Sequence, residues 1–115
     1  MRVNFEDWHI GQSRDFPTSS GIYCVFSKLK GKLIYIGQAS NLRDRIQDHE
    51  RWGDFERHRD GPYLATTYAK LGSSHLDDVE GRLIKINNPP ENKVIPASYY
   101  SGTLELAGYV WGLKS

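Results

Sequence analysis

Two short apolar runs separated by a polar turn dominate the first half of the chain and predict a β-hairpin. Residues 22–26 (IYCVF) and 32–36 (KLIYI) are rich in β-branched and aromatic residues. Because side chains alternate between the two faces of a strand, Tyr23 and Tyr35 share a face only if the turn has the right parity. We therefore predict a loop with an odd number of residues, such as three residues that close on Gly31 in a left-handed conformation.

The residues after the hairpin have apolar side chains at helical spacing. Ser40 or Asn41 is a suitable N-cap for a helix that ends near Arg51. Its inward stripe is formed by Leu42, Ile46 and His49. Arg45 is one turn from both ends of this stripe, so it lies at the edge of the core. The hairpin and the helix thus bring two tyrosines, an arginine and a histidine together, a group of side chains suited to handling phosphate.

The second half of the chain predicts a charged loop, a strand and a second helix. The loop spans residues 52–62 and the strand spans residues 63–70. The helix is capped by Ser73 or Ser74 and stops at Asn87-Asn88, before a proline pair. Its apolar stripe is formed by Leu76, Val79, Leu83, Ile84 and Ile86.

Glu80 interrupts the apolar face of the second helix. It lies one turn after Leu76 and one turn before Leu83, so it points inward. An unpaired buried carboxylate costs several kcal/mol, so Glu80 requires a cation. An arginine in a structural ion pair and a metal ion are equally good candidates. Asp77 and Asp78 are instead first-turn acids, where the helix dipole favours negative charge.

The two ends of the chain carry less pattern. Residues 1–20 mix aromatic and polar side chains and predict a short extended or single-turn segment covering the core. After the proline pair, Val94-Ile95 is expected to return to the core. Residues 96–115 are expected to form a packed tail with an extra strand or a short helix, and a dimer contact through this tail is an alternative. Since the length suits one domain, we expect a single domain over residues 1–115 with its core at about 21–95.

The composition indicates an ordinary globular protein, with 38% hydrophobic and 25% charged residues. A net charge of +1 excludes a strongly basic nucleic-acid coat but permits a local basic patch. No apolar run reaches the ~20 residues of a membrane span, and the first residues lack a signal-peptide pattern, so we expect a cytoplasmic protein. Cys24 is the only cysteine and is expected to be a buried thiol. The histidines expected at the surface, which lack zinc-like spacing, are His9, His58 and His75.

The tripeptides GIY at 21–23 and YIG at 35–37 resemble the signature of the GIY-YIG nuclease superfamily. Arg45 follows eight residues after Gly37. The further matching positions are His49, Glu80 and Asn92. The resemblance implies a small α/β (α+β) fold, with a three-stranded antiparallel sheet flanked by helices. It also implies metal-dependent hydrolysis of DNA phosphodiester bonds, with DNA as the partner.

The resemblance assigns a role to each polar side chain of the motif. Glu80 would be the metal ligand for one Mg²⁺ or Mn²⁺ ion, since Mg²⁺ needs only one or two carboxylates. Arg45 would bind phosphate as a bidentate fork. Tyr23 is the first choice as general base or water-orienting group, with Tyr35 as its partner and His49 sharing the proton. A phenolate at pH 7 costs about 4 kcal/mol, which the arginine and the metal would offset.

The other candidate positions have less specific roles. Asn92 either orients the substrate or caps local backbone, and Gly21 and Gly37 are structural parts of the motif. The candidate DNA-contacting side chains are Lys28, Lys30, Lys32 and Lys93. Gln38 is a departure, because repair members of the family often have a lysine directly after YIG.

Two functions remain open at this point. The first is an active endonuclease, and the second is a DNA-binding module that keeps the fold but does not cut. The filled polar positions favour the enzyme. Repair, restriction and mobile-element roles are not distinguished by these residues, and a homodimer or a targeting partner is compatible with them.

Overall fold

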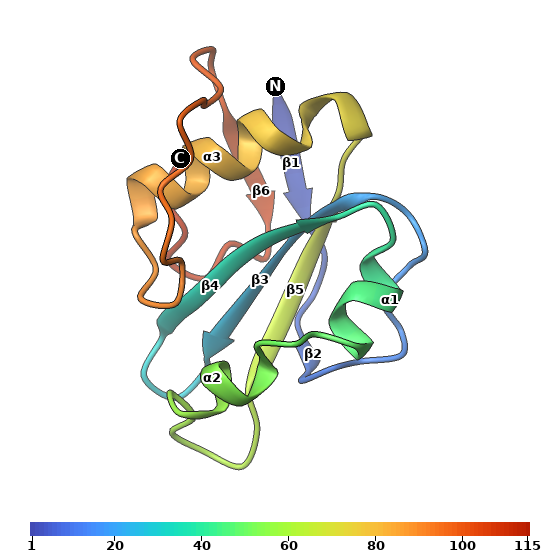
Figure 1. Cartoon of the computed structure of the whole chain (residues 1–115), viewed down its shortest axis with the longest axis vertical. Helices are drawn as coiled ribbons and strands as arrows, with labels where there is room; N and C mark the ends of the chain where they lie inside the picture. Colours follow the sequence, from blue (N-terminus) through green and yellow to red (C-terminus); the bar gives the residue numbers. More distant parts are fainter.

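The computed structural model describes residues 1–115 and contains one mixed sheet flanked by helices (Figure 1). The strands are β1 (Arg2–Phe5), β2 (His9–Ile10), β3 (Gly21–Ser27), β4 (Lys32–Ala39), β5 (Ala65–Lys70) and β6 (Glu105–Gly108). The helices are α1 (Leu42–Gln47), α2 (Trp52–Glu56) and α3 (Leu76–Asn87), the last preceded by a 3₁₀ turn, η1 (Ser73–His75). The longest helix has 12 residues, and no helix has the length and apolar character needed to span a membrane.

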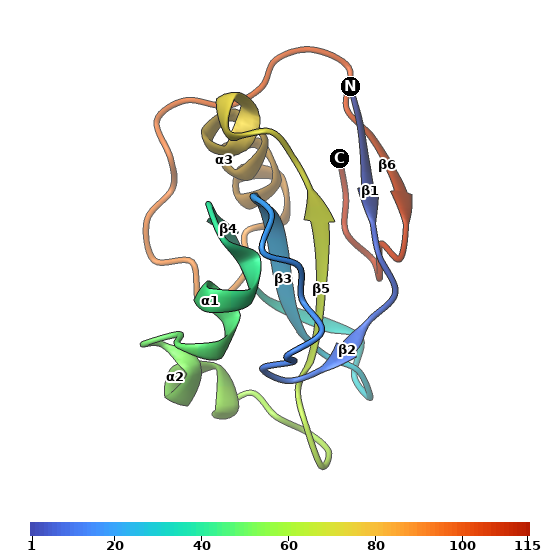
Figure 2. The ribbon, with the colours of Figure 1, turned by 90° about the vertical axis from the view of Figure 1, so that its right-hand side faces the viewer.

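The expected α+β class, a sheet flanked by helices, is confirmed, but the sheet has six strands rather than three. The order is β4-β3-β5-β1-β6, and β2 pairs with β5. β4, β3 and β5 are the expected antiparallel group. Strands from both ends of the chain extend this group. β1 and β6 pair in parallel and lie together at the edge in Figure 2. Each of these added strands has four residues or fewer, which is too short to show a sustained alternation.

The loop between β3 and β4 has four residues, so the predicted odd-numbered loop was wrong. Ser27 pairs with Lys32, and Gly31 closes the turn with a positive φ of 63°. The consequence drawn from the odd loop is nevertheless correct. Tyr23 and Tyr35 share one face of the sheet, with their ring centroids 6.1 Å apart.

A β-bulge restores the parity that an even loop would have lost. Val25 pairs with Tyr35, whereas Phe26 pairs with Leu33, so Ile34 is an extra residue on β4. Ile34 is fully buried, on the same side as the motif tyrosines. Because the bulge sits between the turn and the tyrosine of YIG, it shifts that side chain onto the required face.

The two faces of the sheet carry separate hydrophobic clusters. α3 packs on one face, and the side chains buried there include Val3, Phe5, Ile22, Cys24, Ile36, Leu83 and Leu104. α1 and α2 pack on the other face, and the side chains buried there include Phe16, Tyr23, Val25, Ile34, Leu42, Ile46 and Phe55. Burial raises the pKa of the Cys24 thiol to about 12, as expected of a buried structural cysteine. Residues from both ends of the chain therefore complete the core.

α1 is shorter than predicted and is followed by a second helix where a loop was expected. Asn41 caps α1, because its Oδ1 accepts the backbone N–H of Asp44 at 3.1 Å. α1 ends at Gln47, so His49 lies in the turn between α1 and α2 rather than on a helix. After this turn α2 packs against the same face of the sheet, where its Phe55 is fully buried.

The segment after α3 does not return to the core as predicted. Val94 and Ile95 are 76% and 62% exposed, and Ile86 on α3 is 44% exposed. The chain instead crosses over the outer side of α3 at Gly81, where a Cβ would collide with the carbonyl of Ser98. Val94 and Ile95, which precede this crossing in the chain, therefore stay at the surface.

Candidate active site

Two glycines of the motif allow the close packing around Tyr23. Tyr23 pairs with Gly37 across β3 and β4, and a Cβ on Gly37 would overlap the tyrosine ring. The ring therefore lies across β4 and approaches the edge of the sheet. A Cβ on Gly21 would collide with the Ala69 carbonyl and the Leu42 side chain. Glycine at this position lets β5 and α1 pack closely against β3.

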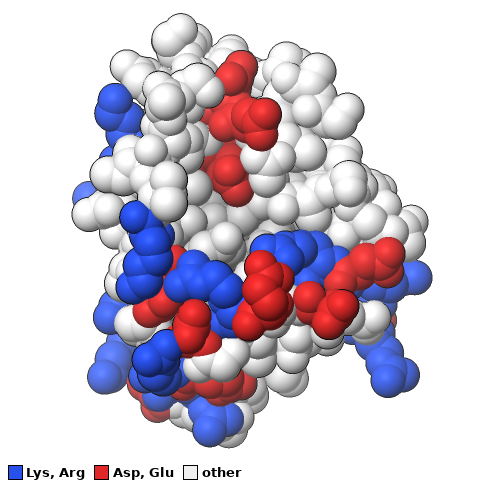
Figure 3. Space-filling view, in the orientation of Figure 1, with Lys and Arg blue, Asp and Glu red and all other residues white.

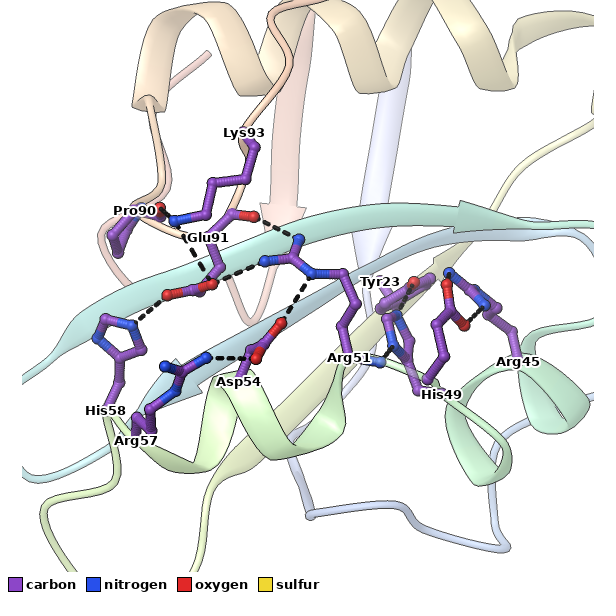
Figure 4. A network of polar contacts seen from close by, with 11 residues as sticks. Tyr23, Arg45, His49, Arg51, Asp54, Arg57, His58, Pro90, Glu91 and Lys93 are labelled. Carbon is purple, nitrogen blue, oxygen red and sulfur yellow. Dashed lines mark hydrogen bonds and ion pairs between the residues drawn. The ribbon is translucent and has the colours of Figure 1, made fainter.

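The hydroxyl of Tyr23 is held by His49 (Figure 4). The His49 Nε2 atom lies 2.7 Å from the Tyr23 oxygen, and its Nδ1 accepts the backbone N–H of Arg51 at 3.2 Å. Because Nδ1 is an acceptor, the neutral ring carries its hydrogen on Nε2 and donates it to Tyr23. This arrangement favours His49 as a group that positions Tyr23, rather than as one that shares the proton.

The environment keeps both side chains neutral in the free protein. Burial, and then the neighbouring Tyr35, raise the pKa of Tyr23, while the Arg45 guanidinium beside it acts in the opposite direction. Burial, and then Arg45, lower the pKa of His49 to about 4. At neutral pH the pair is therefore a phenol and a neutral imidazole, and deprotonation of Tyr23 needs further positive charge nearby.

Acidification is expected to destabilise the wild type more than a His49→Gln variant. The pKa of His49 is about 4 in the folded protein and ordinarily 6.5. The stability that comes from its neutral form is therefore fully present above pH 6.5 and is lost as the pH falls towards 4, by up to about 3 kcal/mol. Glutamine keeps an N–H donor and does not titrate. Urea unfolding at pH 7, 6 and 5 measures this difference, with exposed His75→Gln as the control. Equal losses in wild type and His49→Gln would contradict it.

Arg45 forms a two-point ion pair with Glu50. Its Nη1 lies 2.5 Å from Glu50 Oε2 and its Nη2 lies 3.1 Å from Oε1. The Glu50 side chain is 64% exposed, so solvent screens the pair and an incoming anion displaces it at little cost. A carboxylate and a phosphate present two oxygens to a guanidinium in the same way. Arg45 is thus held beside Tyr23 in a geometry that fits a phosphate, and the role of Glu50 was not foreseen from the sequence.

A cavity of about 290 Å³ lies at the outer edge of β4. Its lining residues are Tyr35, Arg51, Glu80, Ile84, Asn92, Lys93, Val94 and Pro96. The Glu80 carboxylate is half-buried here and has no ion-pair partner, since none of the ion pairs in the protein includes it. Burial raises its pKa and Asp77 adds to this, while a hydrogen bond from Gln38 acts in the opposite direction. A structural arginine is therefore not the cation that Glu80 requires.

The donor set at Glu80 fits Mg²⁺. The carboxylate accepts a hydrogen bond from the Gln38 side chain on Oε1, and the residue lines the cavity. No cluster of three or more ligating side chains is present, so there is no all-protein cage. Mg²⁺ keeps several waters and is bound through one or two carboxylates, which is what this cavity offers.

Asn92 uses both ends of its amide on the backbone of β4. Its Nδ2 donates to the Ile36 carbonyl at 2.9 Å, and its Oδ1 accepts the Ile36 N–H at 3.0 Å. β4 is the edge strand, so these backbone groups have no neighbouring strand to pair with. The geometry supports the alternative in which Asn92 caps backbone, here at the floor of the cavity.

A buried carboxylate next to Asn92 ties α2 to the chain after α3 (Figure 4). Glu91 Oε1 lies 2.7 Å from Arg51 Nη2, and Glu91 Oε2 lies 2.6 Å from His58 Nε2. The prediction of a surface histidine at position 58 was wrong, because that side chain is only 21% exposed and is paired. His9 is half-buried and His75 is exposed. Arg51 is thereby fixed at the cavity as a second arginine that the sequence did not single out.

The candidate DNA-contacting lysines do not lie together. Lys93 lines the cavity next to Glu80. The hairpin lysines lie at the tip of β3 and β4, and Lys28 is five positions along the chain from Tyr23, or roughly 16 Å in extended backbone. The Lys28 ammonium lies 3.5 Å from the centre of the Trp8 ring. Only Lys93 of this group is brought to the site.

Comparisons with known proteins agree with this geometry. Residues 19–93 match the family model of the GIY-YIG catalytic domain. The solved GIY-YIG N-terminal endonuclease domain of UvrC from Thermotoga maritima, bound to its catalytic divalent cation magnesium, is 25% identical with a TM-score of 0.55. The match covers 69% of this chain and 89% of that domain. A point mutant of the same domain has a TM-score of 0.57 at 24% identity, over 70% of this chain and 90% of that one.

Curated relatives match over a shorter segment. The UvrABC system protein C of Borrelia duttonii is 41% identical over 49 residues, which are 43% of this chain and 8% of that protein. The protein of the same name from Borrelia recurrentis matches equally. The chain thus corresponds to a small part of these relatives. Because the family model spans more than half of the chain and the fold agrees, the chain belongs to the GIY-YIG catalytic domain family.

Proposed function

We propose that this chain is a metal-dependent endonuclease that hydrolyses DNA phosphodiester bonds at the edge of β4. The observation that carries the proposal is the combination of a buried phenol and a half-buried carboxylate without a cation. Tyr23 is the phenol, with His49 and Arg45 around its oxygen, and Glu80 is the carboxylate. A phosphate beside Arg45 would supply the reacting group, and a metal ion at Glu80 would supply the missing positive charge. The divalent cation bound by the related UvrC domains supports this assignment.

Arg45 binds the scissile phosphate in this proposal. The phosphate takes the place of the exposed Glu50 carboxylate on the guanidinium fork. Mg²⁺ bound at Glu80 would supply positive charge for the phosphate and for the leaving oxygen. Lys93 and Arg51 line the same cavity and are placed to contact the neighbouring backbone of the DNA.

Tyr23 is the proposed general base. Its oxygen accepts a hydrogen bond from His49 and lies beside Arg45, and both interactions favour the phenolate. The phenolate takes a proton from water as the water oxygen bonds to phosphorus. The bond from phosphorus to the 3′ oxygen breaks, and that oxygen leaves and is protonated by solvent. Tyr35 lines the cavity 6.1 Å from the Tyr23 ring and is placed to orient the water.

The charge distribution favours recognition by a few specific contacts. Figure 3 shows basic and acidic side chains interspersed across the lower half of this face, with a separate acidic group above them. The acids of α3 are Asp77, Asp78 and Glu80. Such a surface offers no continuous basic track for the DNA backbone, so we expect the arginine fork and the metal to contribute much of the affinity.

Nicking of supercoiled plasmid tests the proposal. The wild type is expected to nick the plasmid with Mg²⁺ and to be inactive with a chelator, because the metal charge is needed for the transition state. A double variant, Arg45→Ala with Glu80→Gln, is the negative control for contaminating nucleases. Mg²⁺-dependent binding without cleavage over duplex, single-strand, flap and junction substrates would contradict the endonuclease and support the non-cleaving DNA-binding module.

A further inference from the structure

We propose that Gln38 positions the carboxylate of Glu80 for metal binding and that Asp77 in turn fixes Gln38. This inference rests on the proposed metal-dependent function and adds two residues to its site. Gln38 lies near the end of β4, directly after the YIG tripeptide. Asp77 and Glu80 lie on α3, which packs against the same strand. The contact therefore joins the strand that carries the motif to the helix that carries the ligand.

The orientation of the Gln38 amide is determined by its partners. The Gln38 Nε2 atom lies 2.7 Å from Asp77 Oδ1 and 3.1 Å from Glu80 Oε1. Ionised carboxylates only accept hydrogen bonds, so the nitrogen end of the amide faces them. Its two hydrogens are then both used, one on each acid. No hydroxyl or carboxylate side chain at this position would satisfy both acids at once.

The Gln38 side chain restrains one oxygen of Glu80 and does not contact the other. Asp77 and Glu80 are three residues apart, so their side chains lie on one side of α3. The shorter contact anchors the amide on exposed Asp77, and the longer one restrains Glu80 Oε1. The Gln38 amide does not contact Glu80 Oε2, and Glu80 lines the cavity. The metal would therefore find its ligand already oriented.

A neutral amide is well suited to this task. It restrains two carboxylates without neutralising them, so the full charge of Glu80 is available to a cation. Outer partners of this kind orient metal ligands, and their loss typically weakens metal binding about 10- to 100-fold.

Calorimetric titration of the free protein with Mg²⁺ tests the inference. Gln38→Met keeps the length of the side chain and removes the donor, and we expect it to weaken Mg²⁺ binding by about 10- to 100-fold. Cleavage should then need more Mg²⁺, with the rate at saturating metal within a few-fold of wild type. Gln47→Met, at the exposed end of α1, is the matched control and should leave the Mg²⁺ affinity unchanged.

A second variant keeps the test informative if Gln38→Met does not fold. Asp77→Ala changes an exposed residue and should weaken Mg²⁺ binding in the same direction by a smaller factor. Unchanged or tighter Mg²⁺ binding in the folded variants would overturn the inference, as would a lower metal-free stability without any change in affinity. Glu80→Gln serves as the reference: if it binds Mg²⁺ as tightly as wild type, the proposed metal site itself fails, an outcome distinct from a failure of Gln38 alone.

Discussion

Replacing Glu80 by glutamine is expected to abolish Mg²⁺-dependent cleavage while the metal-free protein stays as stable as wild type or becomes more stable. Glutamine keeps the shape of the side chain and removes the charge that retains the metal. It also removes a half-buried carboxylate that has no ion-pair partner, which is a costly group in the absence of metal. If Glu80 had instead been the partner of a structural arginine, the same change would cost about 3–5 kcal/mol.

Thermal unfolding with and without excess Mg²⁺ measures the stability and the metal binding, and the plasmid-nicking assay measures the cleavage. Metal should raise the unfolding midpoint of the wild type and leave that of Glu80→Gln unmoved, because only a folded state that binds the ion gains stability from it. Asp78→Asn removes a charge from the same turn of α3 and should respond to Mg²⁺ like wild type. A Glu80→Gln protein that unfolds at a far lower temperature in metal-free buffer, or that still cuts DNA, would contradict the assignment of Glu80 as the metal ligand.

The parts of the site that the sequence predicted are those set by local spacing. The faces of the two tripeptides follow from strand alternation, and the inward position of Glu80 follows from helical periodicity. The N-cap at Asn41 is likewise a local feature, set within a few residues of the helix start. The shared face of Tyr23 and Tyr35 was predicted for the wrong reason. A bulge within a strand leaves no mark on the hydrophobic pattern when the extra residue, here Ile34, is itself apolar.

The parts that were missed depend on contacts between distant segments. The sequence predicts Arg51 only as the end of a helix, but Glu91 fixes it at the cavity across 40 residues of chain. Gln38 stood out only as a departure from a family pattern, and its bonds to α3 span some 40 positions as well. Glu50 lies in the turn between α1 and α2, and α2 is held against the sheet by the buried Phe55. Such contacts follow from how the elements pack together, which spacing along one element does not encode.

Arg45→Ala is expected to lower the cleavage rate by about 10²- to 10³-fold, a loss typical of removing one charge-stabilising group from a transition state. The fold should survive, since Arg45 is partly exposed and its partner Glu50 is a solvent-screened turn residue. Single-turnover rates at saturating DNA and Mg²⁺ measure the effect without a contribution from substrate affinity.

Two further variants identify what Arg45 contributes. Arg14→Ala removes an exposed arginine that makes no ion pair and should leave the rate unchanged, which controls for the loss of one positive charge. Arg45→Lys keeps the charge but loses the planar fork, so its rate should lie between wild type and alanine. If lysine restores the full rate, charge alone is sufficient and the two-point geometry seen with Glu50 is not used on the phosphate. If alanine itself cuts at the wild-type rate, Arg45 is no more than a surface residue of α1 and the phosphate is bound elsewhere. Arg51 and Lys93, the cations that line the cavity, are then the candidates.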